Sequence, residues 1–298
     1  MSSPRKKQLE KRLGYLGFAM AEKAFLRKDP IRAERSGMRL GNLTFKVMKK
    51  RRNVALANLR LAFPEKTEEE RLAIAQECFR HFGRIFADFL RSSQRTDEEM
   101  RQTTRLTDMR YFDEALKEGK GAILITGHFG NWERAAHAIV AAGYKVTVVA
   151  RDANDGDLNQ AVMKIREKQG IQVLSRGSAA RGIFTKLKKN EIVAILPDQN
   201  SSDIFVPFFG RPCGTVTGPA AIHARTGAPI IPFFCKRVGP NQYDARAYPP
   251  LKPLEGYEPV EGMTRAINNA IEAAIRETPE QWLWFHDRWK SARKAGLL

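Results

Sequence analysis

The sequence has little cysteine and no long apolar run. Its three cysteines among 298 residues are far apart and lack metal-type spacing, so we expect buried thiols in a reducing compartment. No stretch approaches the roughly 18 uncharged apolar residues that a membrane-spanning helix requires. The sequence also lacks the Gly-x-Ser-x-Gly elbow, the phosphate-binding Gly-x-x-x-x-Gly-Lys-Ser/Thr loop and a strand-linked Gly-x-Gly-x-x-Gly. These absences exclude the common serine hydrolase and nucleotide-binding classes.

Basic residues outnumber acidic ones, above all near the N-terminus. The chain has 51 Lys and Arg against 33 Asp and Glu, which gives a net charge of +18. Residues 1–60 hold 17 basic and 4 acidic side chains, whereas residues 61–100 hold 6 and 9. This distribution predicts an anionic partner, either a phospholipid surface or nucleic acid. A basic nucleic-acid-binding protein is the non-enzyme alternative, but no zinc-finger spacing or RNP motif occurs, so we expect no nucleic-acid partner.

The first third of the chain has helical patterns. Residues 3–27 read as an amphipathic basic helix, which can lie in a membrane interface or dock on its own domain. Residues 31–62 also look helical, and Thr67-Glu-Glu-Glu70 is a capping box that begins a helix through about Leu90. The expected buried side of that helix is Leu72, Ala75, Phe79, Phe82, Phe86 and Phe89. We interpret residues 1–105 as a basic helical region that faces the membrane.

Residues 106–298 alternate between helical and strand patterns. Strands are expected at 122–126, 145–150, 171–174 and 191–196, separated by helices at 132–142, 157–169 and 178–189. A further buried strand, an edge strand and an amphipathic helix are expected at 229–235, 243–248 and 260–277. This alternation predicts an α/β fold, a largely parallel sheet sandwiched by helices, with an N-terminal helical extension.

The segment Gly127-His128-Phe-Gly130-Asn131-Trp-Glu133 joins the first of these strands to a helix. With Asn131 as the N-cap, Glu133 lies in the first helical turn. An imidazole can accept a proton from a hydroxyl near neutral pH, and a carboxylate can fix its tautomer. We therefore predict that His128 is a general base. The alternative is a histidine that caps the helix beside a glutamate that responds to the helix dipole.

Arg151, Arg176 and Asp198 each follow one of the other predicted strands. Because parallel strands end at one edge of a sheet, these side chains should converge with His128. Arginines there suit phosphate or carboxylate groups, although a surface ion pair is an equal alternative for Arg176 and a weaker one for Arg151. Either Glu133 or Asp198 could orient the imidazole, and the sequence leaves that choice open.

Several sequence blocks resemble the late acyltransferases of lipid A biosynthesis, within the acyltransferase superfamily that has a His-x-x-x-x-Asp/Glu motif. Besides His128 to Glu133, these blocks are 52–65, 196–199, 206–210, 225–229 and 279–286, in the family's order. In that family an Arg after the strand that follows the histidine motif is a functional position, and Arg151 matches it. Arg166 matches a second recurrent arginine.

The resemblance implies that a fatty acyl group is moved from a thioester of acyl carrier protein or coenzyme A to a hydroxyl of a lipid acceptor. A lipid A precursor is the first choice of acceptor, and a lysophospholipid, a phosphoinositide mannoside or an aminolipid are alternatives. No metal or tightly bound cofactor is expected. The implied location is the cytoplasmic face of the bacterial inner membrane. Members of the family often begin with a membrane-anchoring helix, and this sequence departs from them there, so we expect peripheral attachment to the anionic surface.

Further expectations concern the surroundings of the histidine. Backbone N–H groups near Gly130 and Asn131, at a helix N-terminus, are candidates to stabilise an oxyanion. Gln199 opens a polar loop after Asp198 and is a candidate substrate contact, and residues 204–209 form an apolar segment beside it. The C-terminal Trp282, Trp284, His286 and Trp289 suit either a membrane interface or packing against the N-terminal helices.

Overall fold

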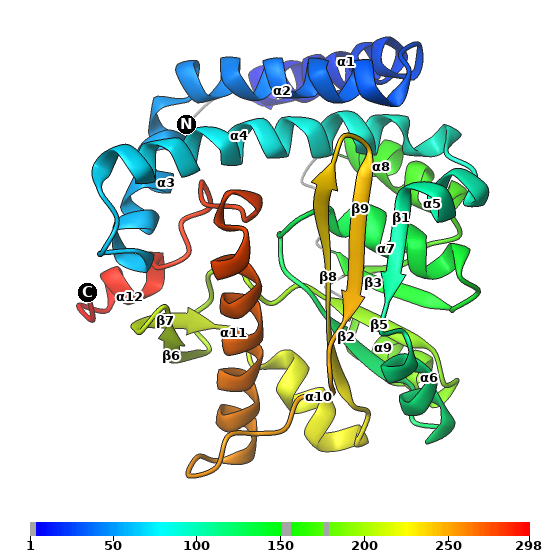
Figure 1. The fold of residues 1–298 in the computed structure, drawn as a ribbon, viewed down its shortest axis with the longest axis vertical. Coiled ribbons are helices and arrows are strands. Elements are labelled where there is room, and N and C mark those ends of the chain that lie inside the picture. Colours follow the sequence, from blue (N-terminus) through cyan, green and yellow to red (C-terminus); the bar gives the residue numbers. More distant parts are fainter. Residues whose placement is uncertain (1–3, 151–155, 176–178) are drawn as a thin grey trace.

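The computed structural model describes residues 4–150, 156–175 and 179–298, and Figure 1 shows a layer of long helices over one end of an α/β sandwich. The helical layer contains α1 (Pro4–Leu26), α2 (Pro30–Val47), α3 (Lys49–Ala62) and α4 (Glu68–Arg91), followed by η1 (Ser92–Gln94) and α5 (Asp97–Thr103). The predicted capping box is confirmed, because the side chains of Thr67 and Glu70 cap α4 reciprocally. The single helix expected over 31–62 is two helices that break at Met48.

The central sheet is α/β in type and largely parallel, as predicted. Its seven strands have the order β1-β9-β8-β2-β5-β3-β4, and only the β8–β9 pair is antiparallel. The strands are β1 (Thr104–Thr107), β2 (Ala122–Ile125), β3 (Val146–Ala150), β4 (Gln172–Ser175), β5 (Ile192–Ile195), β8 (Ile230–Gly239) and β9 (Gln242–Ala247). The sequence predicted that residues 243–248 form an edge strand. This prediction is wrong, because the corresponding strand β9 lies between β8 and the short strand β1.

Helices cover both faces of the sheet, so its strands present apolar side chains to two cores. On one face, Leu124 of β2 packs with α6 (Arg110–Lys117) and α7 (Trp132–Ala141). On the other face, Ile123 and Ile125 belong to a core with α9 (Ala179–Lys188), α10 (Gly218–Thr226) and α11 (Pro259–Glu277). The remaining elements are α8 (Gly156–Lys168), β6 (Ile204–Phe208), β7 (Arg211–Thr215), η2 (Pro279–Gln281) and α12 (Lys290–Lys294).

The apolar segment expected beside the polar loop is strand β6, which pairs with β7 in a separate antiparallel hairpin. Val206 and Phe208 are buried in it, so it packs on the core.

The N-terminal helices pack closely on one another and on the α/β part. A Cβ on Gly37 of α2 would lie 2.3 Å from the carbonyl oxygen of Gly83 in α4, so only glycine permits this crossing. Phe79 of α4 belongs to the same buried cluster as Ile125 and Trp284. Leu72, expected on the buried side of α4, is 46% exposed. The predicted Ala75 and Phe79 are buried, and Phe82, Phe86 and Phe89 are half-buried. The buried side of α4 also includes Cys78 and His81, which the pattern did not predict.

Candidate active site

The turn after β2 brings His128 against Asp198, which follows the neighbouring strand β5. Nδ1 of His128 lies 2.8 Å from Oδ1 of Asp198, and the backbone N–H of His128 donates to Oδ2 at 2.7 Å. Gly127 permits this approach, since a Cβ there would lie 3.1 Å from Oδ2 of Asp198. Asp198 is buried, while the His128 side chain is 22% exposed. The carboxylate is thus enclosed and the imidazole remains accessible.

The electrostatic environment of this pair raises the proton affinity of the His128 imidazole. Burial lowers the pKa of His128, but the charge and hydrogen bond of Asp198 outweigh burial, with a smaller contribution from Glu133, so the net pKa lies above its ordinary value. Burial raises the pKa of Asp198, and the His128 contacts and the Trp282 hydrogen bond reverse this, so its net pKa lies below its ordinary value. Asp198 is therefore ionised at neutral pH and stabilises a protonated His128.

The C-terminal segment holds the loop that carries Asp198. The indole N–H of Trp282 donates to Oδ2 of Asp198 at 2.9 Å. The backbone N–H of Asn200 donates to Nε2 of His286 at 3.1 Å, and the buried Arg288 donates to the carbonyl of Gln199 at 3.3 Å. Trp282, Trp284 and Trp289 are buried, so the membrane-interface alternative for them is wrong. The sequence pattern did not predict this supporting role, although a buried indole N–H usually needs an acceptor.

Glu133 does not contact His128, because it is engaged by Arg166 of α8. Its Oε1 and Oε2 accept from Nη2 and Nε of Arg166 at 2.5 and 3.0 Å. The indole N–H of Trp132 also donates to Oε1, at 3.1 Å. The sequence left open whether Glu133 or Asp198 contacts the imidazole. In the structure the imidazole is bound to Asp198. Arg166 and Glu133 form an ion pair in the lining of the same cavity.

Gly130 and Asn131 shape the turn, but their N–H groups are already bonded. Gly130 N–H donates to the carbonyl of Gln281 and Asn131 N–H to that of Cys235, at 2.9 and 2.8 Å. Gly130 has φ +56°, and a Cβ there would lie 1.9 Å from the carbonyl oxygen of Cys235. Asn131 is the predicted N-cap, because its Oδ1 accepts from Arg134 N–H. Because both N–H groups already donate to carbonyl oxygens, they are not free to stabilise an oxyanion, and that prediction is wrong for these two groups.

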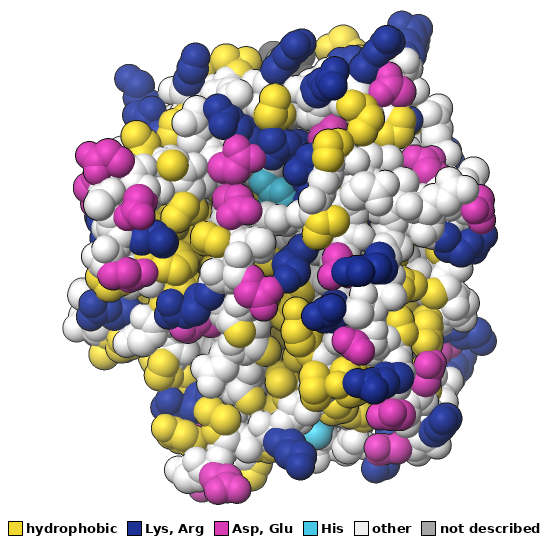
Figure 2. Space-filling model, in the orientation of Figure 1, with side chains coloured by type: hydrophobic (Ala, Val, Ile, Leu, Met, Phe, Trp, Pro, Cys, Tyr) yellow, Lys and Arg dark blue, Asp and Glu magenta, His cyan; other side chains and the backbone are white. Residues whose placement is uncertain are grey.

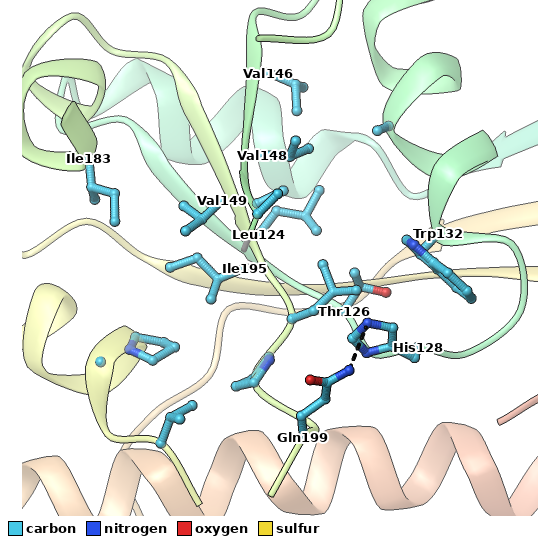
Figure 3. A pocket seen from close by; sticks show the side chains of 18 of the residues that line it. Leu124, Thr126, His128, Trp132, Val146, Val148, Val149, Ile183, Ile195 and Gln199 are labelled. Atoms are coloured by element: carbon cyan, nitrogen blue, oxygen red, sulfur yellow. Dashed lines mark hydrogen bonds between the residues drawn. The ribbon is translucent and has the colours of Figure 1, made fainter. Parts of the chain in front are cut away.

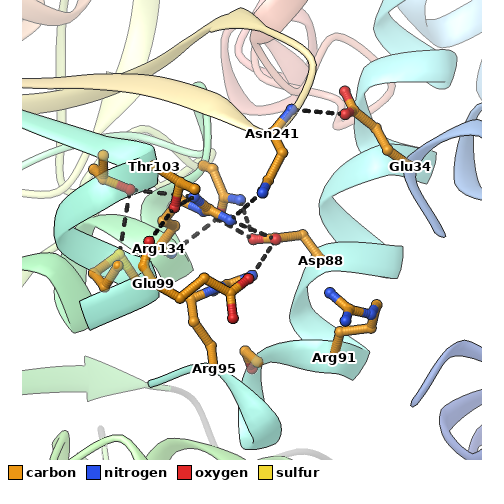
Figure 4. Close-up of polar contacts among 12 residues, drawn as sticks. Glu34, Asp88, Arg91, Arg95, Glu99, Thr103, Arg134 and Asn241 are labelled. Atoms are coloured by element: carbon orange, nitrogen blue, oxygen red, sulfur yellow. Dashed lines mark hydrogen bonds and ion pairs between the residues drawn. The ribbon is translucent and has the colours of Figure 1, made fainter. Parts of the chain in front are cut away.

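A buried ionic network anchors the same turn to α4 (Figure 4). Asp88 accepts from Nδ2 of Asn131 at 2.7 Å, from Nη2 of Arg134 at 3.0 Å and from Arg95. Arg134 is fully buried and also donates to Asn241 and Thr103. Burial raises the pKa of Asp88, but the two arginines overcome this and hold it below its ordinary range. The network fixes where α7 begins, and with it the position of the His128 turn.

Gln199 lies next to the free nitrogen of the imidazole. Its Nε2 is 3.4 Å from Nε2 of His128, as the dashed line in Figure 3 marks. With Nδ1–H donated to Asp198, Nε2 is the acceptor nitrogen of the neutral ring. Gln199 thus lies beside the ring nitrogen that can accept a proton, and its contact with a substrate stays a prediction.

His128 opens into a cavity of about 780 Å³ with a mainly apolar lining (Figure 3). Trp132, Glu133, Arg166, Gln199 and Asn200 provide polar groups near the histidine. Leu124, Val146, Val148, Val149, Ile183 and Ile195 provide apolar side chains of the lining. This volume is typical of a pocket for a small organic ligand, about 300–1,000 Å³, and its lining suits a hydrocarbon chain.

The structure does not cover every predicted site residue. Arg151 and Arg176 lie outside the described residues, so their convergence with His128 stays a prediction. Within ranges 4–150, 156–175 and 179–298, no cluster of three or more His, Cys, Asp or Glu side chains could hold a metal ion. Within the same ranges, no helix is both long and apolar enough to span a membrane.

Comparison with known proteins places the chain in a family. A family profile described as bacterial lipid A biosynthesis acyltransferase matches residues 8–291. The lipid A biosynthesis lauroyltransferase of Escherichia coli K12 is 27% identical over 265 residues, which cover 86% of this chain and 85% of the relative. The palmitoleoyltransferase of the same strain is 26% identical, with 86% and 84% covered.

Relatives whose names give a different acceptor have about the same sequence identity to this chain. A phosphatidylinositol mannoside acyltransferase of Mycobacterium tuberculosis CDC 1551 is 27% identical over 216 residues, which cover 70% of this chain and 67% of the relative. These names share acyl transfer to a glycolipid and differ in the glycolipid.

Proposed function

The chain belongs to the bacterial lipid A biosynthesis acyltransferase family and is an acyltransferase that acts on a glycolipid, and we propose that its acceptor is a lipid A precursor. In this proposal a fatty acyl group leaves a thioester of acyl carrier protein or coenzyme A and joins an acceptor hydroxyl. One observation carries the chemistry, namely an imidazole bound to a buried carboxylate at the mouth of an apolar cavity.

His128 is the general base. Its Nδ1–H stays bonded to Asp198, which leaves Nε2 to accept the proton of the acceptor hydroxyl as the oxygen attacks the thioester carbonyl carbon. The tetrahedral intermediate then expels the thiolate as the C–S bond breaks. The imidazolium returns its proton to that sulfur, so the products are an ester and a free thiol. Asp198 stabilises the imidazolium between these steps.

Gln199 and the start of α7 supply candidate donors for the oxyanion. Once the substrate hydroxyl occupies the acceptor nitrogen of His128, the Gln199 amide that lies 3.4 Å from it becomes free to donate. The N–H groups of Trp132 and Glu133 are in the first turn of α7, where a helix leaves its N–H groups without intrahelical partners. The positive end of the helix dipole adds to this stabilisation.

The cavity would hold the acyl chain of the donor. Burial of each methylene contributes about 0.8 kcal/mol, so a chain of fatty-acid length gains several kcal/mol from an apolar lining. Such binding places the thioester carbonyl at the cavity mouth beside His128. The Arg166–Glu133 pair in the cavity lining, and Arg151 and Arg176 if they converge there, would bind charged groups of the donor or the acceptor.

The outer faces of α1 to α3 provide a surface for peripheral membrane attachment. Met20, Leu43, Val47 and Met48 are 68%, 55%, 64% and 45% exposed. Exposed basic residues surround them, and Figure 2 shows dark blue and yellow side chains together along the upper edge, over α1 and α2. Apolar side chains among basic ones suit the interface of an anionic bilayer. We therefore keep residues 1–105 as the membrane-facing region and the cytoplasmic face of the inner membrane as its location.

An apolar groove at this surface is separated from His128 by the ring of Trp132. It has a volume of about 390 Å³ and is lined by Leu40, Met48, Phe82, Phe86 and Phe285, among others. The ring of Phe82 lies 5.8 Å from that of Trp132, and the Trp132 ring lies 5.2 Å from the His128 ring. In this proposal the acceptor lipid moves from the bilayer toward His128 along these apolar side chains.

Purified enzyme tests the proposal directly. It is incubated with an acyl-thioester of acyl carrier protein or coenzyme A and, separately, with a lipid A precursor, a phosphatidylinositol mannoside or a lysophospholipid. Mass spectrometry should find one added acyl group on the lipid A precursor. Transfer to the mannoside or the lysophospholipid instead would replace the proposed acceptor and keep the chemistry.

A further inference from the structure

The cavity at His128 has two lobes on opposite faces of the sheet. Its lining includes consecutive residues of two strands, Val148 and Val149 of β3 and Ala194 and Ile195 of β5. Consecutive strand residues point to opposite faces. Val148 and Ala194 accordingly belong to the core under α7, and Val149 and Ile195 pack on the core under α9 and α11.

The topology of the sheet explains how one cavity reaches both faces. Pairing between β3 and β5 ends at Val148 and Ala194, while β3 stays paired with β4 as far as Ala150. The helix after β3 is α8, which lies beside α7 through the Arg166–Glu133 pair, whereas α9, before β5, covers the other face. Neighbouring strands whose helices lie on opposite faces leave a crevice at their carboxyl ends. The two lobes meet in that crevice, next to His128.

The first lobe lies between the sheet and helices α7 and α8, and its deep end is closed. The residues there are Leu124, Ala135, Ala136, Val146 and Ile171. Each of them is at most 8% exposed. A closed apolar end suits a chain that terminates in a methyl group, such as the acyl chain of the donor.

The second lobe lies against α9 and α10 and is more open. Ile183, Phe184, Pro219 and Ile222 line it. It reaches Arg225, an exposed residue whose guanidinium lies 5.0 Å from the centre of the Phe184 ring. Its sides are apolar and one end is near solvent, so this lobe suits a chain that belongs to a larger lipid.

We propose that the second lobe binds a hydrocarbon chain of the acceptor while the first lobe holds the acyl chain of the donor. This inference rests on the proposed acyl transfer. A methylene group occupies about the volume of a water molecule in the liquid, roughly 30 Å³, so a cavity of about 780 Å³ has room for two chains of moderate length.

The number of bound chains tests this inference without any turnover. Radiolabelled dodecanoic acid, below its micelle concentration, is titrated onto the full-length protein by equilibrium dialysis. We expect two chains per wild-type protein. Ala136→Phe, which fills the first lobe, and Ala221→Phe, which fills the second, should each reduce this number to one. His128→Ala should still bind two, so chain binding is measured independently of acyl transfer.

Binding of a single chain to the wild type, or an unchanged number in the Ala221→Phe variant, would overturn the second lobe as a chain site. If either Phe variant fails to fold, labelling of the wild type with a fatty acid that carries a terminal diazirine gives the answer. Cross-links in both the α7–α8 and the α10 peptides support two chain sites, and cross-links in the α7–α8 peptides alone contradict them. Either negative result leaves the assignment of His128 and Asp198 to acyl transfer untouched.

Discussion

The imidazole of His128 is bound to Asp198 at 2.8 Å, although these residues are 70 positions apart in the chain. The carboxylate five positions after the histidine, Glu133, is instead bound to Arg166. The two acidic groups near the imidazole therefore have different partners. In the proposed mechanism Asp198 fixes the tautomer of His128, while Glu133 binds Arg166 in the cavity lining.

Replacement of these two carboxylates should have unequal effects. Asp198→Asn removes the charge that stabilises the imidazolium, so we expect kcat to fall by about 10²–10⁴-fold. Glu133→Gln keeps the His128–Asp198 contact, so its main effect should be a higher KM for a charged substrate. Steady-state kinetics of both variants with an acyl thioester separate the two. Equal losses of kcat would contradict the assignment.

The pH dependence of kcat/KM should show the raised pKa of His128. Neutral imidazole is the active form, so activity should increase with pH through a pKa above the ordinary value of about 6.5. In Asp198→Asn the negative charge that raises the pKa of His128 is absent, while burial still lowers that pKa. The increase of kcat/KM with pH should therefore occur at lower pH. The profiles are measured at constant ionic strength with both proteins. If kcat/KM increases over the same pH range in both proteins, His128 is not the titrating group.

The buried Asp88 network should matter chiefly for stability. Asp88→Asn leaves Arg95 and Arg134 buried without their counter-ion, a loss typically of about 3–5 kcal/mol in the free energy of unfolding. Urea denaturation followed by circular dichroism measures it. Glu118→Gln, which breaks the exposed pair with Lys120, is the matched control and should leave the midpoint unchanged. A similar midpoint for Asp88→Asn and wild type would refute the anchoring role.

Vesicle binding should depend on the exposed apolar side chains of α2. Leu43→Asp and Val47→Asp introduce negative charge and remove apolar contact, so both should weaken binding to phosphatidylglycerol vesicles. Added salt should weaken wild-type binding as well. Leu254→Asp alters a residue that is 37% exposed in the segment before α11 and serves as the control. Co-sedimentation measures all three, and unchanged binding of the α2 variants would place the membrane contact elsewhere.

Much of the fold could be predicted because it depends on local patterns. The capping box at Thr67 and the alternation between residues 122 and 195 identify their helices and strands. The order of the sheet depends on contacts between distant segments. Local pattern therefore did not reveal that β1 covers the outer edge of β9, or that β6 forms a hairpin with β7.

The site was predictable in part for the same reason. Strand ends indicated that His128 and Asp198 share an edge, and the structure has them in contact. The contributions of Trp282, Arg288 and Asp88 come from segments that approach only in the folded chain. A residue that acts by supporting another has no local signature in its own sequence neighbourhood.

The acyl-transfer rate of purified His128→Ala tests the central claim most directly. It is measured with an acyl thioester and the accepted lipid, after circular dichroism and thermal unfolding have verified the fold. With the general base removed, we expect a rate at least about 10²-fold below wild type, with a native unfolding midpoint. Turnover near the wild-type rate in the folded variant would contradict a mechanism based on His128.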